Sequence, residues 1–93
     1  MTTAQLLDLL KLHLQIRNDA LDNYLTQLIS TAEESIVEEG ITIDYSSAND
    51  CQLIVMYAGW LYLQRLSGDE MPRMLRYKLN NRIFKQAIVN AQQ

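Results

Sequence analysis

Residues 20–40, "ALDNYLTQLISTAEESIVEEG", hold the clearest helical pattern in this 93-residue chain. Apolar residues recur in it at steps of four, three, four and four: Leu21, Leu25, Leu28, Ala32 and Ile36. This spacing is typical of one face of an α-helix. We predict a helix from Ala20 to Glu39, capped by Asn18 or Asp19 and ended by Gly40 in a left-handed conformation.

Three further helices are predicted around this one. A short Leu-rich helix begins at a capping box formed by Thr2 and Gln5. A second capping box, Ser47 with Asp50, precedes a helix from Ala48 to Leu66 that is apolar on nearly every side. A helix of that kind lies centrally in a core or is covered by another subunit.

The last predicted helix runs from Pro72 to about Asn90, because proline suits the first helical position. Between the second and third helices, residues 41–45 alternate apolar and polar and could be extended, although one such piece makes no sheet. We therefore predict an all-α single domain, residues 1–93, of about four helices. Two longer central helices pack antiparallel, beside a short N-terminal helix and an amphipathic basic C-terminal helix. Residues 72–93 form a docking helix that could be mobile before assembly.

Charge is unevenly distributed along the chain. Residues 1–50 carry nine acidic and two basic residues, a net charge of −7, whereas residues 51–93 carry six basic and two acidic residues, a net charge of +4. The two halves together give the overall charge of −3. Such polarity suits contact between the C-terminal part and an acidic surface, which a second copy of the chain could supply.

No group of residues indicates an enzyme. His13 and Cys51 are the only histidine and the only cysteine, and together they do not supply the ligands of a metal site. No nucleophile motif or phosphate-binding glycine loop occurs. We interpret His13 as a surface or boundary residue and Cys51 as a small core residue. We therefore predict no catalysis, metal, cofactor or small-molecule substrate.

A membrane-spanning role is not predicted either. The longest uncharged apolar run, Leu53–Leu63, has eleven residues, whereas a spanning helix needs about 20. The aromatic residues of this run, Tyr57, Trp60 and Tyr62, could stack on nucleic-acid bases. Because Leu and Ile surround them, we favour core packing or a subunit interface.

The stretch "MPRMLRYKLNNRIFK", residues 71–85, carries the strongest local signal. It contains no acid and five of the eight basic residues: Arg73, Arg76, Lys78, Arg82 and Lys85. Read as a helix, one broad arc holds the apolar residues Leu75, Leu79, Ile83, Phe84, Ala87 and Ile88. Lys78, Arg82 and Lys85 lie together on the other side. They could form a solvated face, dock onto an acidic protein surface, or contact nucleic acid.

Docking onto protein is the interpretation we favour for these basic residues, because the acidic remainder of the chain would repel phosphates. An acidic cluster on the second helix has two interpretations of its own. It is either a solvated face or a docking surface for a basic partner. Its members are Glu33, Glu34, Glu38 and Glu39.

The order of these features resembles the small head–tail connector proteins of tailed bacteriophages and prophages. The resemblance covers residues 4–84. It is carried by "LLDLLKLHLQIRNDALDNYLTQLISTAEESIVEEGI", residues 6–41, by "LIVMYAGWLYLQRL", residues 53–66, and by "SGDEMPRMLRYKLNNRI", residues 67–83. The first segment contains the spaced residues Asp22, Leu25, Leu28, Ile29, Ala32 and Ile36.

The resemblance implies a helical structural protein without catalysis. Such proteins assemble into a ring below the portal of the filled capsid, continue the DNA channel, and offer a docking surface to the tail or a stopper protein. The implied location is the virion, with the host cytoplasm during assembly. The implied partners are further copies of the chain, the portal, and a tail or stopper protein, with secondary contact to DNA. No site residue is transferred from the family.

The combined hypothesis is a ring-shaped head–tail connector. In it Arg73, Arg76, Lys78, Arg82 and Lys85 dock onto the portal or onto the four glutamates of a neighbouring copy. The alternative is a small DNA-binding regulator that uses the basic C-terminal helix.

Overall fold

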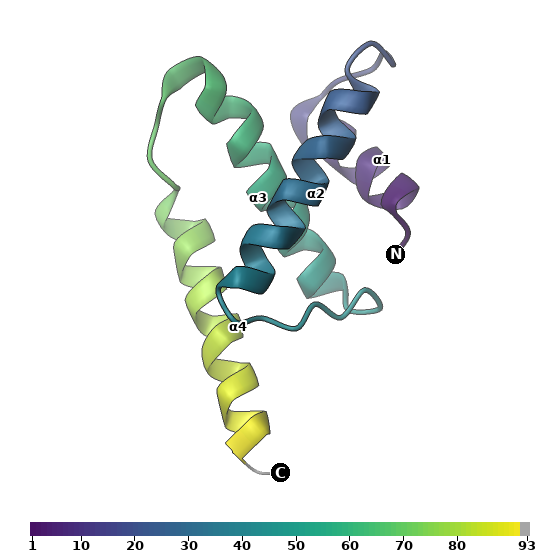
Figure 1. Ribbon diagram of the computed structural model, residues 1–93. Coiled ribbons are helices and arrows are strands. Elements are labelled where there is room, and N and C mark those ends of the chain that lie inside the picture. Colours follow the sequence, from purple (N-terminus) through teal and green to yellow (C-terminus); the bar gives the residue numbers. More distant parts are fainter. Residues whose placement is uncertain (92–93) are drawn as a thin grey trace.

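The computed structural model of the protein describes residues 1–91, which form four helices and no strand. In chain order these are α1 (Thr3–Leu14), α2 (Asp22–Glu38), α3 (Ala48–Ser67) and α4 (Arg73–Ala91). Figure 1 shows α2 and α3 crossing at the centre in an X, α2 descending and α3 rising, with α1 on one side and α4 on the other. The prediction of an all-α fold with two long central helices is confirmed.

Several predicted helix ends are also confirmed. The backbone N–H of Gln5 donates to the Thr2 hydroxyl at 3.2 Å, and the Thr2 N–H donates to the Gln5 side chain at 2.9 Å, so the capping box of α1 is complete. Gly40 and Gly68 follow α2 and α3 with φ of 98° and 70°. Only glycine adopts this left-handed conformation without a penalty from its side chain, which explains both residues.

The predicted N-cap of α2 is wrong. The helix begins at Asp22, and its N-cap residue Leu21 makes no side-chain hydrogen bond. Asn18 instead accepts from the backbone N–H of Ala20, in a turn before the helix. Asp19 accepts from the Lys11 ammonium at 2.9 Å. Both side chains therefore have nearer partners than the first turn of α2.

The second predicted capping box forms only in half. The Asp50 backbone N–H donates to the Ser47 hydroxyl, as expected. The Asp50 carboxylate, however, accepts from the backbone N–H of Asp44 and from Arg82 of α4. Residues 41–47 form an irregular loop and not an extended strand. The start of the fourth helix also differs from its prediction: α4 begins at Arg73, one residue after Pro72.

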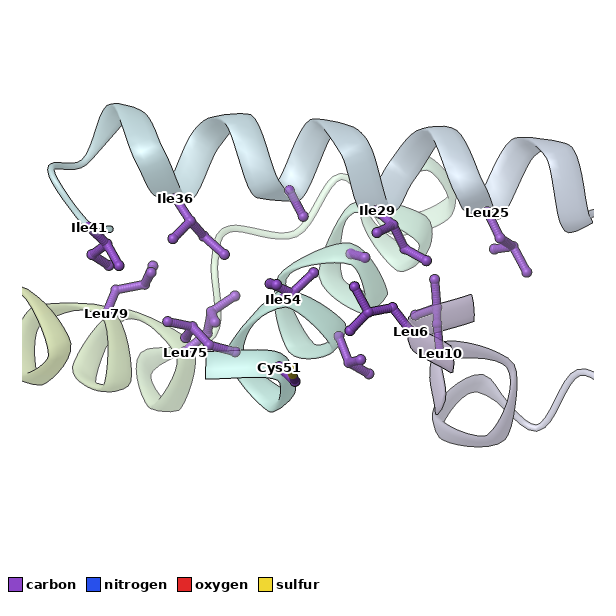
Figure 2. Packing of buried hydrophobic residues seen from close by; sticks show 14 residues of the cluster. Leu6, Leu10, Leu25, Ile29, Ile36, Ile41, Cys51, Ile54, Leu75 and Leu79 are labelled. Atoms are coloured by element: carbon purple, nitrogen blue, oxygen red, sulfur yellow. The ribbon is translucent and has the colours of Figure 1, made fainter. Parts of the chain in front are cut away.

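The core lies where α2 crosses α3 and α1. Figure 2 shows Leu25, Ile29 and Ile36 of α2 above Ile54 of α3, with α1 and α4 closing the two ends. Of the residues predicted on the apolar face of α2, Leu25, Ala32 and Ile36 are buried, and Leu21 and Leu28 pack against the core in part. The buried set is Leu6, Leu10, Leu25, Ile29, Ala32, Ile36, Ile41, Cys51, Leu53, Ile54, Val55, Ala58, Leu75 and Leu79.

The fourth helix differs from its prediction in one important respect. Its single predicted apolar arc is divided, because Leu75 and Leu79 are buried whereas Phe84 and Ile88 are exposed. The helix continues without a break through Asn80 and Asn81. It packs against α3 and extends beyond the other helices (Figure 1). The last two residues of the predicted docking helix, 92–93, lie outside the described residues.

Candidate assembly surfaces

The five basic residues of α4 fall into two groups. Arg76 and Arg82 form ion pairs within the chain, with Glu39 at 2.6 Å and with Asp50 at 2.8 Å. Arg73, Lys78 and Lys85 form no ion pair with any described residue. Only the charges of this second group can therefore bind a partner without the loss of an ion pair within the fold.

Arg82 makes the most extensive contact of the group. Its guanidinium donates to both Asp50 oxygens, at 2.8 and 3.2 Å, and to the carbonyl of Thr42 at 2.8 Å. Asp50 is 5% exposed, and such a buried carboxylate needs a partner of opposite charge. The bidentate geometry is the strong form of this pair. Arg82 therefore joins α4 to the start of α3 and to the preceding loop.

Gln86 extends the same contact by one helical turn. Its side-chain oxygen accepts from the Thr42 N–H at 2.6 Å, and its side-chain nitrogen donates to the Gly40 carbonyl at 2.5 Å. The sequence analysis missed this residue. Its position four residues after Arg82 could have indicated a shared contact, because that spacing places both side chains on one face of the helix.

Lys78 and Lys85 lie beside this contact in an open cleft of about 520 Å³ between α4 and the start of α3. Arg82 lines the cleft with them, so the three basic residues predicted to share one side of the helix do so. Asp44 and Asp50 lie on the opposite wall. The cleft therefore has a basic α4 wall and an acidic wall.

The acidic cluster of α2 is also divided. Glu33 accepts a hydrogen bond from the Tyr45 hydroxyl, and Glu39 holds Arg76. The Glu33 carboxylate, followed by partial burial, raises the pKa of Tyr45 to about 12. Glu34 and Glu38 are exposed, one turn apart, and form no ion pair within residues 1–91. These two present an acidic surface to solvent.

The aromatic residues of α3 have partners inside the protein. The rings of Tyr57 and Trp60 meet edge to face at 5.5 Å, and the Trp60 indole donates to the Asp69 carbonyl. The Arg65 guanidinium lies 4.5 Å from the ring centroid of Tyr62 and 5.0 Å from that of Tyr24. These cation–π contacts occupy faces that base stacking would need.

Other kinds of site are not found in the described part of the chain. No helix in residues 1–91 is long and apolar enough to cross a membrane. The same residues hold no group of three or more His, Cys, Asp or Glu side chains suited to a metal ion. His13 lies against Gly59 of α3, and Cys51 is buried, as expected for a core thiol.

These observations define a small all-α protein that exposes unpaired basic residues on α4 and unpaired acidic residues on α2 within the described residues. The chain belongs to the phage gp6-like head–tail connector proteins, because the model of that family matches residues 4–90, nearly its whole length. The resemblance noted for residues 4–84 is thereby confirmed. Membership gives the protein a structural connector role in the phage particle. No curated protein and no solved structure matched significantly.

Proposed function

We propose that the protein forms a ring that joins the capsid portal to the tail of a phage or prophage particle, without catalysis. The observation that carries this proposal is family membership across residues 4–90. The partners are other copies of the chain, the portal, and a tail or stopper protein. The protein acts in the virion and assembles in the host cytoplasm.

The separated charges support a ring over a two-fold dimer. A ring of identical subunits uses contacts in which one face meets a different face of the neighbour. Arg73, Lys78 and Lys85 lie on α4, whereas Glu34 and Glu38 lie on α2, and all five are without ion pairs in the described residues. Opposite charges on different faces favour such head-to-tail association and disfavour pairing of like faces.

The same arrangement makes DNA a secondary partner. Two of the five basic residues of α4 are held by Glu39 and Asp50 within the chain. The remaining three stand on a protein with a net charge of −3, which weakens attraction to phosphates. Contact with DNA is therefore proposed only for residues that face the channel of an assembled ring. A DNA-binding regulator is the competing outcome.

The test mixes the purified protein with rings of a portal protein from the same phage or prophage, and follows binding by native mass spectrometry and electron microscopy. We expect a stable complex with several copies of the chain for each portal ring. Lys78→Glu with Lys85→Glu should weaken this complex while circular dichroism stays unchanged. Arg17→Glu is the matched control, because Arg17 is an exposed base outside α4.

Two results would contradict the proposal. One is a protein that stays monomeric at high concentration with portal present. The other is tight, salt-sensitive retardation of duplex DNA by the protein alone, which would favour the regulator instead.

A further inference from the structure

We propose that α4 has a second apolar face, and that a second copy of the chain covers it with a hollow between its α1 and α3. This contact would be the apolar centre of the ring interface, so the inference rests on the proposed function and deepens it. Four features of the structure carry it: the spacing of the exposed residues, the charges beside them, the hollow, and the separation of the two surfaces.

The exposed residues of α4 follow a regular spacing. Steps of three and four connect Met74, Tyr77, Asn81, Phe84, Ile88 and Ala91, which we call the outer seam. All six are exposed, and Phe84 is 67% exposed. This alternation marks the a and d positions of heptads, where one helix packs against another. The buried residues Leu75 and Leu79 lie on the opposite side of α4, against α3.

An exposed seam of this kind is unusual in a monomer. Met74, Tyr77, Phe84 and Ile88 are large apolar residues on one side of one helix, and each buried aromatic ring can remove 150–250 Å² (roughly) from water. Large exposed apolar residues gathered on one side of a helix are typical of a site of association. The seam therefore indicates a partner.

Two outer seams cannot pair well with each other. The heptad positions beside the seam hold Arg73, Lys78 and Lys85, and α4 contains no acidic residue. These flanking positions set partner choice in paired helices. Pairing α4 with α4, in either direction, would place like charges together. The covering surface must therefore belong to another part of the chain or to another protein.

The chain offers a suitable surface away from α4, between α1 and α3. An open hollow of about 540 Å³ lies between α1 and α3 and is lined mainly by apolar side chains, among them Leu9, Leu12, Val55 and Met56. Leu12 is 75% exposed, the highest value among the large apolar residues. Leu63 lies seven residues after Met56, which is two turns of α3, so the two residues share one face of the helix. Leu63 is exposed.

The polar groups of the hollow complement those of the seam. His13 and Gln52 line it, and either could pair with Asn81, which needs a hydrogen-bond partner once buried. Asp8 is exposed on α1 one turn before Leu12. The nearby Lys11 is held by Asp19 and Asp22. Met1 also lines the hollow, and its ammonium donates to the Tyr45 carbonyl. Asp8 is therefore the negative charge on this side of α1 that the lysines of α4 can meet.

The two surfaces lie on different helices of one chain, the seam on α4 and the hollow between α1 and α3. In Figure 1, α1 lies on the right of the molecule and α4 descends at the lower left. A protruding face and a receiving hollow at different places produce head-to-tail contacts, which close into a ring or continue as a filament. A second copy therefore accounts for both unpaired surfaces with a single contact.

The test uses two cysteine variants in a Cys51→Ala background, Phe84→Cys and Leu12→Cys, with an affinity tag on one of them. Each variant is oxidised alone and then mixed with the other at high concentration. We expect disulfide-linked dimers to be at least tenfold more abundant in the mixture than in either variant alone. Dimers of Phe84→Cys alone would show α4–α4 pairing and overturn the inference. Equal, low cross-linking in all three samples would overturn it as well.

A second test disrupts the outer seam by a substitution that introduces no cysteine. Phe84→Asp should abolish self-association in light scattering, and Leu66→Asp should leave it intact, because Leu66 is a similarly exposed apolar residue near the end of α3. If both variants associate like the parent, the seam is not the interface. Portal binding measured on the same samples separates this result from a failure of the proposed function, because a chain with another self-contact would still bind the portal.

Discussion

Replacement of Arg82 by methionine should destabilise the protein more than any other single change of charge on α4. The change keeps the aliphatic stem but removes two charge-assisted bonds to Asp50 and one to the Thr42 carbonyl. The carboxylate of Asp50, 5% exposed, would keep only the Asp44 N–H as donor. Loss of one partner from a buried ion pair costs about 3–5 kcal/mol.

The expected magnitude lies at the lower end of that range. The Arg82 side chain is 21% exposed, so water replaces part of the lost interaction, and we expect a loss of about 3 kcal/mol. In a domain of this size, 1 kcal/mol shifts Tm by about 4–8 °C. Urea unfolding followed by circular dichroism measures the change. Arg76→Met is the matched control, because its pair with Glu39 is 41% exposed on the arginine side and should contribute less than about 1 kcal/mol.

A double-mutant cycle that combines Arg82→Met with Asp50→Asn measures the interaction energy between Arg82 and Asp50. The double variant should lose clearly less stability than the sum of the two single variants, because the second change removes a charge that has already lost its partner. Additive losses, or an Arg82→Met variant no less stable than Arg76→Met, would refute the structural role given to this contact.

Three further predictions concern other contacts of the fold. A Cβ at Gly59 would lie 2.9 Å from the His13 ring, so Gly59→Ala should be near neutral alone but stabilise by about 1 kcal/mol in a His13→Ala background, as measured by urea unfolding. Glu33 raises the pKa of Tyr45 from 10.0 to about 12. The stabilisation of the fold by the Tyr45 hydroxyl is therefore complete below pH 10 and is lost as the pH rises towards 12. Tyr45→Phe should make the free energy of unfolding less dependent on pH between these values. Leu79→Ala should cost about 2–5 kcal/mol in thermal unfolding, because Leu79 is fully buried.

The sequence predicted the parts of the fold that depend on local rules. The spacing of Leu25, Ala32 and Ile36 gave α2 and its buried face, and Thr2 with Gln5 gave the start of α1. Gly40 was expected after α2 for the same reason, since only its local backbone conformation mattered. Such features need no knowledge of the rest of the chain.

Contacts between distant residues were not predictable in the same way. Asp50 fits a capping box by spacing, yet its carboxylate pairs with Arg82, 32 residues later. The docking role proposed for Arg76 and Arg82 treated their charges as free, because no local pattern shows which acid lies beside them. The division of α4 into two apolar faces also depends on where α3 lies. A helical wheel alone cannot place Phe84 on the solvent side.

The position of Cys51 makes the single thiol of the chain a natural reporter of motion. Cys51, which follows Asp50 in the sequence, is 1% exposed, and its thiol donates to the Tyr45 carbonyl. A reagent can therefore reach it only when α1, the loop at Tyr45 or the start of α3 moves away. The rate of thiol labelling would measure how often this corner opens. Slower labelling after ring assembly would show that subunit contact suppresses opening there.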